Sequence, residues 1–298
     1  MILSAPLLQL LLAANGVSGA ELGTASAVSK WNIKESPHFE VLHESAWSPN
    51  SIVLELEKMF SAMRLNMAMF APWMAAEKSK IYIYGSRSSY LAGEFAPPKW
   101  SKGLAYPDRK IVVVYDTGDI VKLKAVLAHE LSHLYFEGYF AEKFKYPPQW
   151  LNEGLAVYLE DIVFTEGGLW RRALPYFNAE RRLPFDDFFG IKLESLKTDA
   201  RISDWYLQSF GVVSYLYRPH TRLQFKNFCE ALRGGDAVET ALWKNYRISG
   251  GKDFSLKWET WLAGYARPAG SQGQASSAFV FKPVTMSSFP FTDFGAKK

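Results

Sequence analysis

Residues 125–137 constrain the fold of this chain more than any other segment. They contain two histidines four residues apart, His129 and His133, with Glu130 directly after the first, in a mostly apolar run. The apolar spacing predicts an α-helix, on which residues four apart lie on the same face. Both imidazoles can therefore be directed at one metal ion, with Glu130 close enough to hold a water on that ion.

The residues around this segment agree with a helix. Asp119 lies where an N-cap is expected, and apolar residues recur at helical spacing at Val121, Ala125, Val126, Leu127, Leu131, Leu134 and Phe136. Two histidines are too few for a catalytic zinc, since such a site takes three protein ligands and keeps one position for water. A third ligand has to come from elsewhere in the chain.

The candidate third ligand is Glu153. It follows Pro147-Pro148 and lies in the first turns of an apolar periodic segment, 150–163, that predicts a second helix. A carboxylate near a helix N-terminus is also typical of a solvated residue that complements the helix dipole. Beside the histidine motif the ligand interpretation is favoured, because the small neighbours Gly154 and Ala156 let the second helix approach the first closely.

These two segments together resemble the gluzincin metallopeptidases, in which a glutamate on the helix after the H-E-x-x-H helix is the third zinc ligand. The interval from His133 to Glu153 is similar to that of the thermolysin branch. The string Trp-Leu-Asn-Glu-Gly-Leu-Ala at 150–156 is closer to the aminopeptidase branch and to bacterial peptidase MA-like proteins. The resemblance holds residue by residue over about 125–160, and in the order of elements over about 36–262.

The resemblance implies a zinc-dependent peptidase with one zinc ion per chain, bound by His129, His133 and Glu153. Zinc lowers the pKa of a bound water to roughly 7, and Glu130 is then the general base that passes the water proton to the leaving amine. Tyr206 is similar to a tyrosine that aminopeptidase-branch and MA-like proteins place on a helix after the third ligand. The resemblance makes it the candidate donor to the oxyanion.

Other positions of the pattern stay open. His220 is the alternative oxyanion donor, because the thermolysin branch uses a histidine, although its place at an apparent helix end also predicts a surface residue. Asn152 is a candidate to hydrogen-bond a ligand histidine. The aspartate that the thermolysin branch often places one turn after its glutamate ligand is Val157 here, which leaves Glu160 and Asp161 as candidates without an assigned role.

The resemblance also bears on the substrate. The aminopeptidase branch captures the substrate N-terminus with a Gly-x-Met-Glu-Asn motif, for which Ala92-Gly93-Glu94-Phe95 is a poor substitute. We therefore expect an endopeptidase, or specialised proteolysis, more than an aminopeptidase. Gluzincin substrates pair with an edge strand near the zinc, and Gly103–Tyr106 or Lys110–Tyr115 are the candidates. An ordinary edge strand with no role in substrate binding is the equal alternative. The alternatives are a catalytically retired binding protein of this fold and a chance motif in an unrelated exported helical protein.

Length and periodicity predict the fold class. Nearly half of the 298 residues are hydrophobic, enough for one large core or two lobes that share a cleft. Strands are predicted at Phe39–His43 and Lys80–Tyr84, with a helix from Ser48-Pro49 between them, and a hairpin at 103–115; helical patterns predominate beyond Pro147. We predict an α+β fold, a small β-sheet lobe with the zinc-binding helix packed on a mostly helical C-terminal lobe, similar to the catalytic core of thermolysin.

Composition predicts the boundaries of the domains. The apolar run Leu7–Ala14, followed by small residues at a cleavable position, predicts a secretory signal peptide over residues 1–20, and this run is too short to span a membrane. The segments that follow are a polar linker (21–35), a metallopeptidase domain (36–265) divided into an α/β lobe (36–120) and a helical lobe (121–265), and a Gly-, Ser-, Pro- and Ala-rich flexible tail (266–298).

Charge and cysteine content bound the location and the partners. The net charge of +4 is slight, and the basic pairs Arg171-Arg172 and Arg181-Arg182 predict a solvated helical face more than an anion site. The single cysteine, Cys229, lies in an amphipathic stretch that predicts a buried, inert thiol. Export without an intramolecular disulfide indicates a bacterial periplasm or exterior. We expect a peptide or protein substrate, no nucleic acid and no stable membrane insertion, and the oligomeric state is open.

Overall fold

The structure, a computed structural model, describes residues 31–44, 51–164 and 168–265. One sheet contains the strands β1 (Asn32–Glu35), β2 (Phe39–His43), β3 (Ser79–Tyr84), β4 (Gly103–Tyr106) and β5 (Ile111–Tyr115). The α-helices of these ranges are α1 (Ser51–Met67), α2 (Arg87–Ala92), α3 (Ile120–Ala141), α4 (Gln149–Ile162), α5 (Leu169–Ala173), α6 (Phe185–Phe188), α7 (Asp199–Leu216), α8 (Arg222–Arg233), α9 (Val238–Tyr246) and α10 (Gly250–Ala263). Within the same ranges, no helix is both long and apolar enough to cross a membrane.

The sheet combines parallel and antiparallel pairing in the order β1-β2-β3-β5-β4. β2, β3 and β5 run parallel, while β1 and β4 pair antiparallel with β2 and β5 at the two edges. α1 connects β2 to β3, because parallel neighbours need a crossover that a tight turn cannot provide. β4 and β5 form the predicted hairpin, which turns through the short 3-10 segment η2 (Pro107–Arg109).

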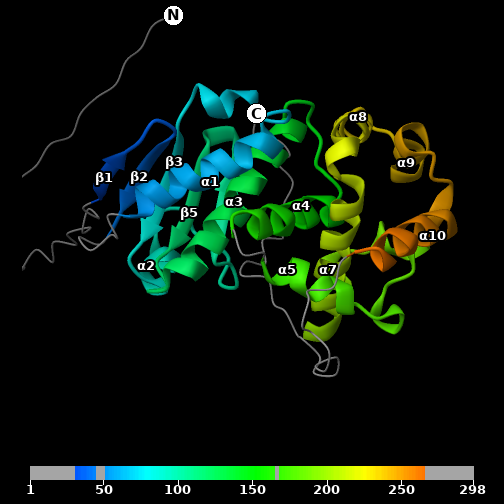
Figure 1. The fold of residues 1–298 in the computed structure, drawn as a ribbon. Helices are drawn as coiled ribbons and strands as arrows, with labels where there is room; N and C mark the ends of the chain where they lie inside the picture. Colours follow the sequence, from blue (N-terminus) through cyan, green and yellow to red (C-terminus); the bar gives the residue numbers. More distant parts are fainter. Residues whose placement is uncertain (1–30, 45–50, 165–167, 266–298) are drawn as a thin grey trace, which may run out of the picture. The chain divides into compact units, whose positions relative to one another are not determined.

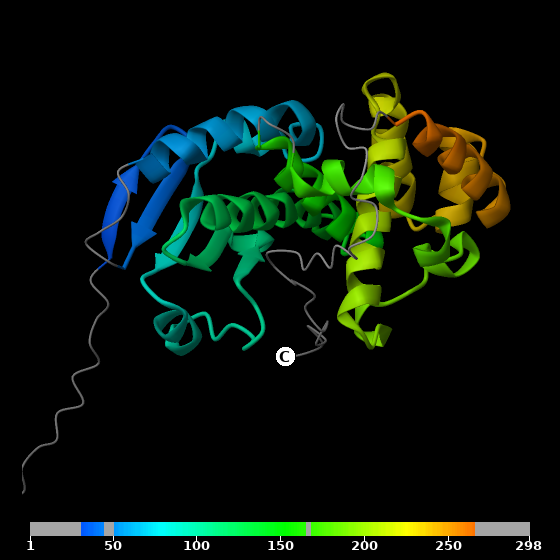
Figure 2. The same ribbon diagram turned by 60° about the horizontal axis from the view of Figure 1, so that its bottom comes forward.

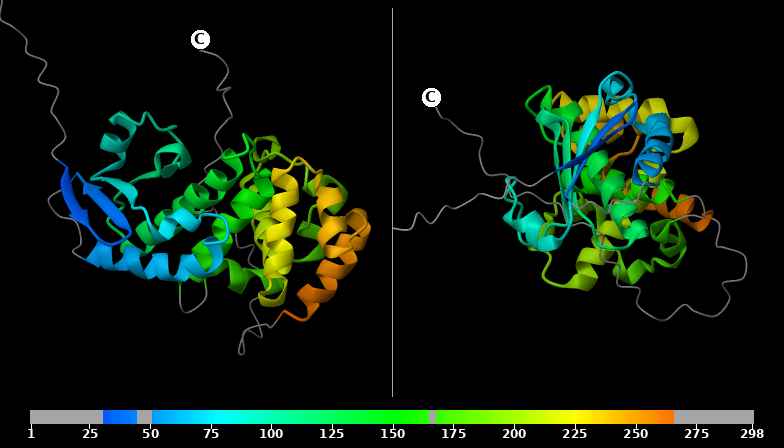
Figure 3. Two further views of the ribbon diagram at one scale, coloured as in Figure 1. Left: turned by 90° about the horizontal axis from the view of Figure 1, so that it is seen from above. Right: turned by 90° about the vertical axis from the view of Figure 1, so that its left-hand side faces the viewer.

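The two faces of the sheet pack against different elements. Ile81 and Ile83 of β3 belong to the main core with side chains of α1 and α3. Tyr82 and Tyr84 of the same strand join a smaller cluster on the other face, together with Tyr90 of α2. This division follows from the two-residue side-chain period of a strand. Figure 3 shows α1 and α2 on opposite faces of the sheet.

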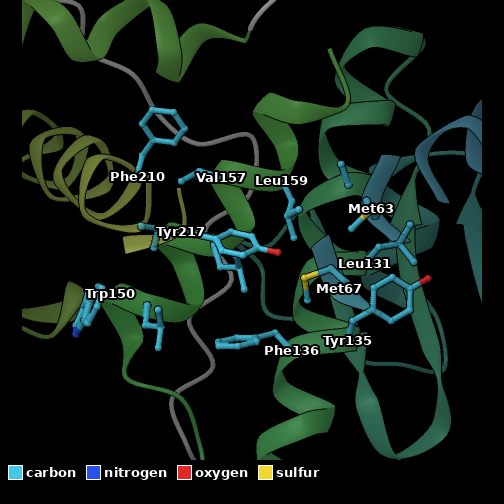
Figure 4. Close-up of a cluster of buried hydrophobic side chains, with 14 of the residues drawn as sticks. Met63, Met67, Leu131, Tyr135, Phe136, Trp150, Val157, Leu159, Phe210 and Tyr217 are labelled. Carbon is cyan, nitrogen blue, oxygen red and sulfur yellow. The ribbon is translucent and has the colours of Figure 1, made fainter. Parts of the chain in front are cut away.

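α3 and α4 lie between the sheet and α7, with α9 and α10 on the far side of α7 (Figures 1 and 2). α8 lies at one end of α7 and also contacts α3, where the hydroxyl of Tyr139 donates to Glu230. The body is mostly helical, and the mixed α+β architecture agrees with the predicted fold class. One apolar core joins these helices to α1, and the residues labelled in Figure 4 are Met63, Met67, Leu131, Tyr135, Phe136, Trp150, Val157, Leu159, Phe210 and Tyr217. Because this buried surface surrounds α3 and α4, both helices are held in fixed positions relative to each other.

α4 and α7 pack closely at Gly154. A Cβ atom at this glycine would lie 2.7 Å from the carbonyl oxygen of Ser209 and 2.9 Å from Cγ2 of Val213, both on α7. We predicted that Gly154 brings the second helix close to the first. This prediction is wrong, because the glycine faces α7 and not α3. Its contact sets how near the side chains of α7 come to Glu153 on α4.

Two further predictions need correction. Residues 32–35, assigned to the linker at 21–35, form the edge strand β1, because their backbone groups pair with β2 although most of their side chains are exposed and so give no apolar pattern. Val121, placed on the apolar face of its helix, is 58% exposed. The predicted signal peptide (1–20) and tail (266–298) lie outside the described residues.

The basic pairs have a structural role that was not predicted. Arg171 forms an ion pair with the buried carboxylate of Asp161 (Nε to Oδ2, 3.1 Å), and Arg181 does so with the buried Asp204 (Nη2 to Oδ1, 2.6 Å). A buried carboxylate needs such a partner, because an unpaired charge in the interior is costly. These arginines therefore tie the 171–182 segment to α4 and α7. Cys229 is buried and unpaired by any disulfide, as expected.

Candidate metal centre

α3 presents His129 and His133, and α4 presents Glu153 to them. One ligand-type atom of each residue lies within 4.8 Å of the others. Nε2 of His129 is 3.4 Å from Oε2 of Glu153, and Nε2 of His133 is 3.8 Å from Oε1 of the same carboxylate. The two imidazole rings are inclined at 77° with their centroids 4.8 Å apart. The structure thus brings together the three residues that the sequence analysis named as candidate metal ligands.

The helix α3 begins where the sequence predicts and carries the cluster into the interior. The Asp119 carboxylate accepts hydrogen bonds from two backbone N–H groups of the first turn and so caps the helix. His129 and His133 follow one turn apart on the face toward α4. Both histidines, Glu130 and Glu153 are at most 2% exposed. At such a buried site the electrostatic interactions between these groups are stronger than in water.

The Nδ1 atoms of the two imidazoles face a second pair of carboxylates. Nδ1 of His129 is 3.5 Å from Oε2 of Glu160, and Nδ1 of His133 is 3.5 Å from Oε1 of Glu137. Nδ2 of Asn152 donates to that Oε1 of Glu137 at 2.7 Å. A carboxylate beside Nδ1 favours a proton on that nitrogen and orients the ring, which leaves Nε2 free to bind a metal.

These contacts give roles to residues that the sequence left open. Asn152, a candidate to hydrogen-bond a ligand histidine, donates to Glu137, which in turn contacts His133. Glu160, which had no assigned role, contacts His129. Sequence reasoning missed Glu137 altogether. Its position four residues after His133, and hence on the same helix face, was the signal that could have identified it.

Burial and neighbouring charges shift the pKa values of the cluster in opposite directions. Burial disfavours a charged His129, but the carboxylates of Glu153 and Glu160 outweigh burial and raise its pKa to about 10. Burial lowers the pKa of His133 to about 4 and raises that of Glu130 to about 8. In the metal-free protein, His129 therefore holds a positive charge between two carboxylates. A bound metal cation would supply positive charge at the same place.

The donor set fits a divalent cation. Both ring nitrogens of His129 and both carboxylate oxygens of Glu130 are buried, and within the described ranges none of these four atoms has a hydrogen-bond partner. Buried polar atoms normally have partners, so this cluster is incomplete without a ligand. Two imidazoles and one carboxylate are the donors of a catalytic zinc site that keeps one position for water.

Tyr206 reaches the cluster from α7. Its hydroxyl donates to Oε2 of Glu153 at 3.0 Å, and its side chain is fully buried. Burial, together with the negative charge of Glu153, raises the pKa of Tyr206 well above its usual value, so the hydroxyl keeps its proton and can donate it in a hydrogen bond. The alternative donor, His220, is exposed in η6 (Pro219–Thr221) after the end of α7.

The strand β4 passes directly over Glu130. A Cβ atom at Gly103 would lie 2.7 Å from Cγ and 2.9 Å from Oε1 of Glu130, so only a glycine lets the strand come this close. β4 is an edge strand, whereas β5 is paired on both sides, with β3 and β4. Of the two strands considered for substrate pairing, Lys110–Tyr115 is therefore excluded, and Gly103–Tyr106 has a free edge within the described sheet.

Comparisons with known proteins agree with this geometry. The model of one protein family, described as the Peptidase MA superfamily, matches residues 74–264, which is more than half of the chain. The matched range includes the strands β3 to β5 and the helices α3, α4 and α7, and therefore every residue of the cluster. No curated protein matches the sequence significantly.

Proposed function

The chain belongs to the Peptidase MA superfamily, and on that premise we propose that it is an exported zinc-dependent peptidase of the gluzincin type. The observation that carries the proposal is the convergence of His129, His133 and Glu153 within 4.8 Å, beside the buried carboxylate of Glu130. Two helices from different parts of the sequence supply these groups, and packing holds them in place. A thermolysin-like catalytic core, export and a periplasmic or extracellular location are parts of this proposal.

Each residue of the cluster has a proposed task. His129 and His133, through Nε2, and Glu153 hold the metal, and a zinc ion bound there would supply a Lewis acid that lowers the pKa of a water to about 7. Glu130 accepts a proton from the attacking water and passes it to the leaving amine. The hydroxyl of Tyr206 donates a hydrogen bond to the carbonyl oxygen as negative charge develops on it.

The environment of Glu130 suits this task. Burial raises its pKa to about 8, about one unit above neutral pH, so in the metal-free protein the carboxyl exchanges its proton near the working pH. A general base is most effective when its pKa is near the working pH. Glu137 and Glu160 orient the imidazoles from outside the cluster and touch no reacting atom, so their role is positioning.

The proposed substrate is an extended peptide that pairs with β4. The free edge of this strand offers backbone groups to a substrate strand beside Glu130. The side chains of β4, in the order Gly103, Leu104, Ala105 and Tyr106, include no carboxylate that could bind a substrate amino terminus. Glu94, in the string considered as a poor substitute for the aminopeptidase motif, is exposed. Cleavage at internal bonds is therefore favoured over removal of N-terminal residues.

The test is cleavage of a mixed peptide library by the zinc-loaded full chain and by Glu130→Gln. We expect internal cuts by the wild type, loss of cleavage in the variant, and one zinc per chain in both. Equal behaviour of the two proteins would refute the catalytic role of Glu130 and favour a catalytically retired binding protein. Absence of stoichiometric metal from both would refute the metal centre itself.

A further inference from the structure

The loop that connects α3 to α4 exposes a large apolar side chain. Phe144 is 95% exposed, more than any other large hydrophobic residue in the described part of the chain. Every residue from 141 to 146 is exposed, and Tyr146 is 57% exposed. An isolated, half-exposed apolar residue is ordinary on a protein surface, but an almost wholly exposed phenylalanine gains nothing from the fold.

The backbone of Phe144 adds a second unfavourable feature. Its φ of +54° lies in the left-handed region, which residues with a Cβ rarely adopt. The N–H of Phe144 donates to the carbonyl of Ala141 (2.8 Å) and the N–H of Lys145 to that of Phe140 (3.2 Å), the pattern that closes a helix with a left-handed residue. Glycine is the usual residue at this position. The fold would thus be served better by glycine, so the phenylalanine calls for another explanation.

The charges around Phe144 point to the kind of partner. Lys143 and Lys145 flank it, both exposed, and neither forms an ion pair with any residue in the described ranges. The acidic neighbour Glu142 is already paired with Arg233 on α8, at 2.5 Å. The tip of the loop therefore combines an apolar side chain, two free positive charges and an exposed tyrosine.

We propose that residues 143–146 form a reversible docking site for an anionic lipid surface. Phe144 would insert among the acyl chains near the head groups, and Tyr146 would lie at the interface, where aromatic rings are favoured. Lys143 and Lys145 would lie against the lipid phosphates, with positive charge complementary to the negative surface. Such contact is peripheral and differs from the insertion of a helix across the bilayer.

The position of the loop relates this contact to the metal centre. The loop joins the two helices that carry the candidate ligands, and His133 lies two turns before the end of α3, about 12 Å along the helix axis. A membrane bound at the loop would therefore lie next to the end of α3 and the start of α4, the two helices that carry the candidate ligands. The inference does not depend on peptidase activity, because it follows from the loop alone.

The test uses sedimentation of the full chain with vesicles. We expect binding to vesicles of phosphatidylcholine mixed with phosphatidylglycerol, weak or no binding to pure phosphatidylcholine, and a decline of binding with added salt. Phe144→Gly should reduce the partition coefficient about tenfold to hundredfold, the size expected for withdrawing one phenylalanine from an apolar environment. Lys143→Glu combined with Lys145→Glu should abolish the preference for phosphatidylglycerol. Leu65→Gln, which removes a 72% exposed leucine on α1, is the matched control and should bind like the wild type.

A second readout separates docking from a structural role. Because glycine suits the left-handed backbone at 144, Phe144→Gly should unfold at the same or a higher urea concentration than the wild type. A less stable variant would show that Phe144 serves the fold, and the proposal would fail. It would also fail if the wild type ignored phosphatidylglycerol vesicles, if Phe144→Gly bound them unchanged, or if the loop captured an acidic peptide while ignoring both kinds of vesicle.

Discussion

Replacement of Gly103 by alanine tests how β4 positions the proposed general base. The new Cβ would lie 2.7 Å from Cγ of Glu130, whereas ordinary contact begins at 3.4 Å, so Glu130 has to move by about 0.7 Å. The side chain of Glu130 is flexible and yields more easily than the paired backbone of β4. The three atoms nearest to this Cβ all belong to the side chain of Glu130.

The size of the effect follows from this displacement. A shift of about 1 Å in a reacting group is associated with about a hundredfold loss of rate. We therefore expect kcat/KM for a cleaved peptide to fall about tenfold to hundredfold, which corresponds to about 1.4–2.7 kcal/mol of transition-state stabilisation. Stability should change by less than about 1 kcal/mol, because alanine in a strand partly offsets the crowding by its smaller loss of backbone entropy.

Gly138→Ala supplies the matched control. Gly138 lies on α3, the helix that carries Glu130. A Cβ atom at Gly138 would be 3.6 Å from the Cβ of Pro107, an ordinary contact distance. This variant should retain full activity and gain about 0.5–1 kcal/mol, because alanine is the better helix former. The assay combines peptide cleavage, zinc content and urea unfolding for both variants. Unchanged cleavage by Gly103→Ala, or loss of its zinc, would refute the idea that β4 acts on Glu130.

Further predictions concern the positioning residues, the helix contact and pH. Glu160→Ala should weaken zinc binding about tenfold to a hundredfold in competition with a chelator, because the carboxylate 3.5 Å from Nδ1 of His129, which orients the ring, is removed; wild-type affinity would exclude a positioning role. Gly154→Ala should lower the free energy of unfolding by about 1–3 kcal/mol in urea titrations, because its Cβ would meet the carbonyl oxygen of Ser209 at 2.7 Å. The folded-state pKa values of His129 and Glu130 are raised to about 10 and about 8. The folded, metal-free protein therefore binds these protons more tightly than the unfolded chain does. Proton binding stabilises the fold at low pH, and this contribution is lost as the pH rises through the folded-state pKa values. Chelator-treated protein should therefore lose stability between about pH 7 and pH 10 in urea titrations, and Glu130→Gln should lose less; a stability that rises over this window would contradict the assigned shifts.

Several features could be predicted from the sequence because they depend on local spacing. The start of α3 at its Asp119 cap, the pairing of His129 with His133 on one face, and the second helix with Glu153 near its start all follow from helix period and end signals. The hairpin of β4 and β5 likewise follows from alternation around a proline. These features lie within one helix or one hairpin, so the residues that decide them are neighbours in the chain.

Other features were decided only by tertiary structure. Whether β4 or β5 is the edge strand depends on the place of β3, and Glu160 takes its partner from the packing of α4 on α3. Gly154 was assigned to the wrong helix, and β1 was assigned to a linker, because the partner in each case is distant in sequence. The sequence by itself determined which side chains can ligate a metal. Burial of one shared core determined which of these side chains come together in space. The free energy that brings distant segments together comes from the whole buried apolar surface and not from any local pattern.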